Sequence, residues 1–99
     1  MSVQAISKLE AQHDYGKYVN LSASALIETG PGTLQGVVIN SHSSGTLKFW
    51  DNTSAATTVI FNTITLSAGE RWIPFFGAKF TTGLYLTIGG TADVTVIYN

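Results

Sequence analysis

The sequence lacks cysteine altogether, and it is poor in charge for its length of 99 residues. The absence of cysteine excludes disulfide bonds and thiolate metal sites. Charged residues make up 11% of the chain, less than half of the roughly 25% found in typical soluble domains. Five Lys and Arg residues against six Asp and Glu residues give a net charge of −1. We therefore expect no nucleic-acid partner and no anionic membrane as a partner.

Long hydrophobic runs are missing as well. No apolar stretch approaches the roughly 20 residues that a membrane helix needs. Residues 1–10 lack the basic segment followed by an apolar segment that marks a secretory signal. We therefore expect no membrane-spanning segment and no signal peptide.

Side chains that could build a catalytic or metal site are few and scattered. His13 and His42 lie 29 residues apart, and neither stands in a ligand-spaced motif. The glycine-rich stretch 30–36 matches no phosphate-binding loop, and zinc, EF-hand and GxSxG spacings are absent. The sequence thus predicts that the protein is not an enzyme and that it holds no metal and no cofactor. Four acidic residues stand alone near the ends of expected strands, where we expect them to be solvated, namely Glu28, Asp51, Glu70 and Asp93.

Hydroxyl side chains take the place of the missing charge. The chain has 13 threonines and nine serines, and residues 52–69 run for 18 positions without one charged side chain. Free monomers usually keep themselves soluble with charges of both signs. At the core of an interface, by contrast, charge carries a desolvation cost. The composition therefore favours a subunit of an assembly over a small domain that is solubilised by Thr, Ser and Asn alone.

The hydrophobic pattern from residue 18 onward alternates with a period of two, as in half-buried β-strands. Turn signals separate the expected strands. Residues 43–45 (SSG) predict a hairpin turn, and the stretch around Gly89-Gly90 predicts a hairpin between 84–88 and 93–98. Pro74 places its strand at an edge or a bulge. This spacing predicts an all-β fold, an antiparallel β-sandwich that is jelly-roll-like, with seven to eight short strands. The expected strands are 18–29, 34–40, 46–51, 57–66, 70–76, 84–88 and 93–98.

Residues 1–17 differ from the rest and form an expected N-terminal arm or short helical segment before a single domain, 18–99. They contain four of the 11 charges, and Val3, Ile6 and Leu9 recur at every third position. Two interpretations stand side by side. The segment is either a frayed terminus or an arm that docks on a neighbouring subunit.

The aromatic residues of two strands are not fully explained by a core. Trp50 shares its face with Lys48, and in the run WIPFF the side chains of Trp72 and Phe76 point opposite to Ile73 and Phe75. One face of that strand meets the core. The other face needs a cover, which a loop, another subunit or a sugar ring would provide.

The chain from residue 45 to 99 resembles a module of small structural proteins of tailed bacteriophages, which include head-decoration (cement) proteins and fibre domains. The matching features are the strand that ends in WDNTS, the Thr-rich strand after it, the LSAG turn and the closing TGLYLTIGGTADVTVIY. The resemblance implies a virion protein that is made in the host cytoplasm and binds the outer capsid surface. Its partners would be the major capsid protein and further copies of itself, with a trimer favoured. The expected interface residues are Val3, Ile6, Leu9, Trp50, Trp72, Phe75 and Phe76.

A second hypothesis is a carbohydrate-binding β-sandwich module, either free or part of a phage fibre. Trp50 and Trp72 would form a shared aromatic platform for a sugar ring, and Asp51 and Asn52 would supply hydrogen bonds. This hypothesis does not require an assembly.

Overall fold

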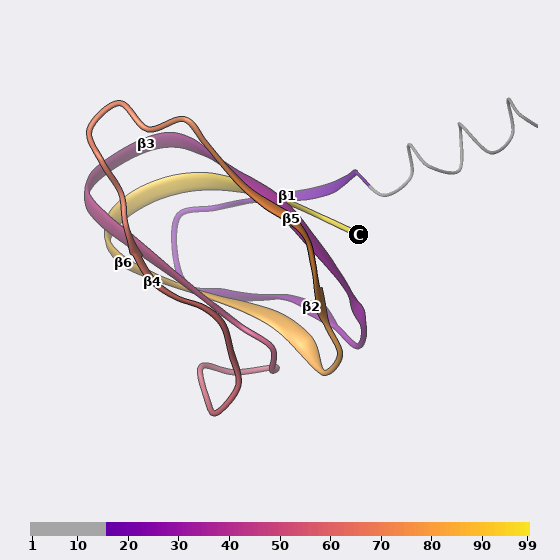
Figure 1. The fold of residues 1–99 in the computed structure, drawn as a ribbon. Helices are drawn as coiled ribbons and strands as arrows, with labels where there is room; N and C mark the ends of the chain where they lie inside the picture. The colour runs from indigo at the N-terminus through magenta and orange to yellow at the C-terminus, as the bar shows by residue number, and fades with distance from the viewer. Residues whose placement is uncertain (1–15) are drawn as a thin grey trace, which may run out of the picture.

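The computed structural model describes residues 16–99 and confirms an all-β, antiparallel fold without a helix in that range (Figure 1). It has six strands where seven to eight were predicted. Two of them, β3 and β6, are far longer than the sequence suggested. The strands are β1 (Lys17–Leu21), β2 (Ala25–Thr29), β3 (Gly32–Trp50), β4 (Val59–Thr65), β5 (Trp72–Phe80) and β6 (Gly83–Tyr98).

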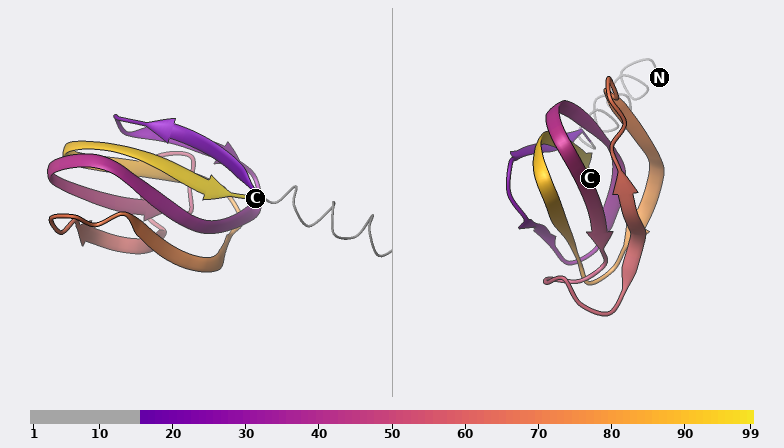
Figure 2. Two further views of the ribbon diagram at one scale, coloured as in Figure 1. Left: turned by 90° about the horizontal axis from the view of Figure 1, so that it is seen from above. Right: turned by 90° about the vertical axis from the view of Figure 1, so that its left-hand side faces the viewer.

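The long strands β3 and β6 pair with each other over almost their whole length and bend together (Figures 1 and 2). Each half of this ribbon has its own outer neighbours. The N-terminal half of β3 and the C-terminal half of β6 lie between β1 and β5. The other halves of β3 and β6 lie between β2 and β4. We call these two parts the β1–β5 half and the β2–β4 half.

The bend replaces two turns that the sequence predicted as hairpins. Residues 84–88 and 93–98 do not pair with each other, and β3 continues through the expected turn at 43–45. Ser44 and Gly90 have positive φ angles, 52° and 67°, at the point where the register shifts. A bulge of this kind bends a strand without reversing it. Local turn residues permit either outcome, and pairing with distant strands decides between them.

The predicted strand 18–29 is also divided, into β1 and β2. The break at 22–24 lies beside the bend of β6, where the Oγ of Ser24 accepts a hydrogen bond from the N–H of Ile88 at 2.8 Å. The predicted inward face of this stretch is confirmed, because Val19, Leu21 and Ile27 all pack against the core.

The core draws its side chains from the inner faces of both halves. Phe49 of the β2–β4 half contacts Phe75 of the β1–β5 half, with ring centroids 5.0 Å apart, and Phe61 stacks on Phe75 at 4.5 Å. Within residues 16–99 no polar or charged residue is buried, so the inner faces of the two halves are held together by apolar packing. The buried side chains are Leu34, Val37, Ile39, Leu47, Phe49, Leu66, Phe75, Phe80, Leu84, Leu86, Ala92, Val94 and Val96.

Strand β5 is an edge strand and also has a bulge, whereas Pro74 predicted one or the other. It pairs with β3 alone, and Pro74 stands opposite Gly36. Between that pair and the next, three residues of β5 face the single residue Gln35. Two of the three, Phe76 and Gly77, have positive φ angles of 58° and 73°. The bulge turns the side chain of Phe76 out of the sheet.

Candidate functional site

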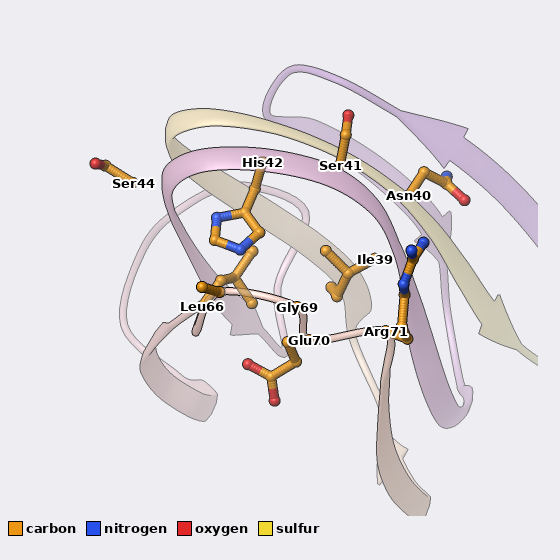
Figure 3. A pocket seen from close by; sticks show the side chains of 10 residues that line it. Ile39, Asn40, Ser41, His42, Ser44, Leu66, Gly69, Glu70 and Arg71 are labelled. Atoms are coloured by element: carbon orange, nitrogen blue, oxygen red, sulfur yellow. The ribbon is translucent and has the colours of Figure 1, made fainter.

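A pocket with a volume of about 570 Å³ lies between the bend of β3 and the loop from β4 to β5 (Figure 3). Two of the polar side chains that line it form hydrogen bonds that hold that loop in place. His42 donates from Nε2 to the carbonyl of Ser67 at 2.9 Å, and Glu70 Oε1 accepts the N–H of Ser67 at 3.0 Å. No group of three His, Asp or Glu side chains in residues 16–99 is placed to hold a metal ion. The lining residues are Ile39, Asn40, Ser41, His42, Ser44, Leu66, Ala68, Gly69, Glu70 and Arg71.

Asp51 closes a loop at the other end of the molecule. Its carboxylate accepts the backbone N–H groups of Thr81, Thr82 and Gly83 at 2.8–3.3 Å, together with the hydroxyl of Thr81. Partial burial by itself would raise the pKa of Asp51, but these hydrogen bonds outweigh it, and the pKa lies below its usual value. Asp51 therefore has a structural role, whereas the sequence suggested a solvated strand end.

The aromatic side chains of β5 divide between core and surface. Phe75 is only 5% exposed and packs in the core, so the interface role expected for it does not fit its position. Trp72 is 48% exposed and Phe76 is 88% exposed, on the face that the sequence left without a cover. Surface aromatic groups of this size are typical of binding sites.

Trp50 lies on the outer surface of the β2–β4 half, as its alternation with Phe49 predicted. Its Nε1 donates to Thr87 Oγ1 at 3.0 Å, and the Nζ of Lys48 lies 4.4 Å from the ring centroid. The register aligns it with Tyr85 on one side and Val59 on the other. Leu26 continues the line beyond Tyr85. This apolar row crosses four strands, and we call it the β2–β4 row: Leu26, Tyr85, Trp50 and Val59.

A row of polar side chains crosses the outer surface of the β1–β5 half. Asn20 and Asn40 both donate to Asp93 Oδ1, at 2.8 and 3.0 Å, and both also donate to Thr95 Oγ1, at 3.3 and 3.1 Å. The hydrogen bonds from Asn20 and then Asn40 hold the pKa of Asp93 below its usual value. The two amides thus fix an exposed carboxylate and a hydroxyl in place.

Several expected site residues are not brought together. Trp50 and Trp72 lie on different halves of the sheet, so they do not form the shared platform predicted for a sugar. Asp51 is engaged by the loop 81–83, and Asn52 donates to the carbonyl of Ala56 at 2.9 Å. Three further predicted interface residues, Val3, Ile6 and Leu9, lie outside the described residues.

Sequence reasoning missed the exposed aliphatic and aromatic residues that complete these surfaces. Tyr18 is 74% exposed on β1, and Leu26 and Val59 are exposed at the two ends of the β2–β4 row. Alternation places them on an outward face, but their alignment across strands depends on a register that no local signal contains.

No protein-family model, no curated protein and no solved structure matches this chain. In residues 16–99 no helix is both long and apolar enough to span a membrane. The function proposed below therefore rests on the exposed surfaces of the protein itself.

Proposed function

We propose that this protein is a structural subunit of a virion, a capsid decoration protein of a tailed bacteriophage that acts as a homo-oligomer. Phe76 carries this proposal. A bulky residue with positive φ costs roughly 1–2 kcal/mol, and its phenyl ring is almost fully in water. Such a residue lowers the stability of the isolated subunit, and burial of its ring against a neighbour would offset that cost.

The surroundings of Phe76 support contact with a protein partner. Residues 72–78 carry no charge, and β5 is an edge strand with an open side. Uncovered strand edges promote association between chains, and closed oligomers cover them. Apolar surface on the β2–β4 row offers a second contact area for the capsid or for another copy. Several weak contacts made at once would give firm attachment to a capsid.

We also propose that the two halves form a jelly-roll β-sandwich. If β3 and β6 are each counted as two segments, the strands in chain order pair as 1-8-3-6 in one half and 2-7-4-5 in the other. Two four-stranded halves that alternate in this way are typical of the jelly roll, which occurs in viral capsid and lectin domains. The contact between Phe49 and Phe75 supports two facing sheets.

The first test is the mass of the protein by light scattering after size exclusion, over a range of concentrations. We expect a discrete oligomer, with a trimer of the 10.5 kDa chain favoured. Phe76→Ser should weaken self-association about 10- to 100-fold, the effect of losing one buried aromatic contact. Tyr18→Ser is the matched control, because it removes an exposed ring from another edge strand.

Two results would overturn the proposal. One is a wild-type protein that stays monomeric at every concentration and does not bind purified capsids of the phage that encodes it. The other is an oligomer that Phe76→Ser and Tyr18→Ser affect equally.

A further inference from the structure

The indole of Trp72 lies directly over Gly36 on the outer surface of the β1–β5 half, which is possible because Gly36 has no side chain. A Cβ at Gly36 would overlap the Cη2 and Cζ2 atoms of the ring. Gly36 is buried beneath the indole, while Trp72 itself is 48% exposed. The ring is therefore packed against the strand beneath it on one side and open to solvent over about half of its surface.

Two further apolar side chains continue from this ring across the sheet. Gly36 is in register with Ile97, and Ile97 is in register with Tyr18. The line from the indole to Tyr18 spans two strand spacings, about 10 Å. It forms a shallow apolar track over three strands, with an aromatic ring at each end.

The fixed polar row runs beside this track. Thr95 and Asn20 each lie two residues along their strands from Ile97 and Tyr18, a distance of about 7 Å. Asp93 adds a carboxylate held by two amides. Within residues 16–99 its second oxygen, Oδ2, accepts no hydrogen bond. The row thus offers oxygen acceptors that are already oriented.

We propose that this surface binds an oligosaccharide, with sugar rings stacked on Trp72 and Tyr18. Sugar hydroxyl groups donate to Asp93 and Asn20, and the hydroxyl of Thr95, which already accepts from Asn20 and Asn40, donates to a sugar oxygen. A pyranose ring has an apolar C–H face and a rim of hydroxyl donors, which matches an apolar track beside a row of acceptors. A track of about 10 Å is longer than one sugar ring, so the ligand has at least two rings.

This site differs from the one expected at the sequence level. It uses Trp72 without Trp50, and it uses Asp93 in place of Asp51 and Asn52. The proposed oligomer interface depends on Phe76, which is also exposed and lies four residues from Trp72 on β5. Variants of the two residues are therefore compared both in sugar binding and in self-association.

The test is binding of the purified full chain to a printed array of plant, animal and bacterial oligosaccharides. Calorimetry with the strongest-binding oligosaccharide then gives the affinity. We expect Trp72→Ala to weaken binding about tenfold or more, the loss typical of one stacked aromatic ring. Asn20→Ala should weaken it as well, because it releases Asp93. Phe76→Ser is the matched control and should leave the affinity unchanged.

Trp72 is outside the core, so Trp72→Ala should still fold, which a thermal melt checks. Gly36→Ala gives a second variant, because its Cβ would displace the indole without removing it and should also reduce binding. That Cβ would also lie 2.9 Å from the carbonyl oxygen of Ile73, so the same thermal melt checks that the variant folds. The proposal is overturned if the wild-type protein binds nothing on the array or if Trp72→Ala binds as tightly as wild type. It is also overturned if Trp72→Ala disrupts self-association as much as Phe76→Ser, because the ring would then belong to the subunit interface.

Discussion

At the scale of single residues, Asp51 shows how one carboxylate replaces several missing contacts. The turn from β5 to β6 leaves the N–H groups of Thr81, Thr82 and Gly83 without strand partners, and Asp51 accepts all three. This arrangement resembles a helix N-cap, where a side-chain oxygen satisfies free backbone donors. The carboxylate is needed in its charged form, because charge strengthens these hydrogen bonds.

We predict that Asp51→Asn lowers stability at neutral pH by about 1 kcal/mol, as the loss of a capping group does. For a domain of this size the midpoint of thermal unfolding would fall by about 4–8 °C. The pKa of Asp51 in the folded protein lies below its unfolded value. Its contribution is therefore present above about pH 4 and is lost as the pH falls through the folded-state pKa.

Thermal melts between neutral and acid pH check this prediction, with Glu70→Gln as control, because Glu70 accepts only one backbone N–H. The gap between wild type and Asp51→Asn should close at acid pH. A gap of constant size at all pH values would contradict the charge-based explanation.

Residue-level features could be predicted from the sequence where alternation decides them. Alternation separated Trp72 and Phe76 from Ile73, and it placed Leu47 and Phe49 inside. It did not reveal the bond network of Asp51, because residues 81–83 are 30 positions away in the chain. It also could not align Trp72 with Gly36, a contact that depends on the register between β3 and β5.

At the scale of elements, the common bend of β3 and β6 is the feature that sets the architecture. Gly90 has a φ of 67°, and a Cβ there would overlap the carbonyl oxygen of Ser44 on the neighbouring strand. The bend therefore depends on glycine for two separate reasons. One is backbone conformation and the other is space.

We predict that Gly90→Ala destabilises the protein more than Gly69→Ala. Gly69 also has a positive φ, 80°, but a Cβ added to Gly69 would have no neighbouring atom within 4 Å. Conformational strain alone should cost about 1 kcal/mol, whereas strain plus a backbone collision should cost roughly 2 kcal/mol or more. Chemical denaturation of the two variants measures the difference, and equal losses would show that the close approach to Ser44 is not limiting.

The bulge of β5 allows a prediction in the opposite direction. Phe76→Asn should raise the stability of the isolated subunit by up to about 1 kcal/mol, because Asn tolerates a positive φ better than Phe. The same variant should weaken self-association, since the ring is lost. Denaturation of dilute, monomeric protein and light scattering at high concentration separate the two effects. If Phe76→Asn instead lowers the stability of the dilute, monomeric protein, Phe76 supports the fold of the subunit itself.

Most elements could be predicted from periodicity and turn residues, including the edge position of β5 with Pro74. Two errors share one physical cause. The hairpin at Gly89-Gly90 and the continuous strand 18–29 were both inferred from local signals. In the structure, pairing between segments far apart in the chain decides whether a glycine pair reverses a strand or bends it.

At the scale of the whole molecule, the scarcity of charge indicates how the protein binds its partners. Residues 52–69 have no charged side chain, and neither has 72–78, which includes Phe76. Beside the β2–β4 row, the Nζ of Lys48 lies over the ring of Trp50. Contacts made by these surfaces would therefore depend on apolar burial, which salt does not screen.

We predict that self-association is not weakened when the NaCl concentration rises from about 0.1 M to about 1 M. This change shortens the Debye length from about 10 Å to about 3 Å and would loosen an interface built on exposed ion pairs. Light scattering of the wild-type protein across the salt series measures the effect, and Lys48→Gln tests the contribution of the cation over Trp50. If the oligomer dissociated at high salt, charge would hold the subunits together, and the apolar surface around Phe76 could not be the main contact.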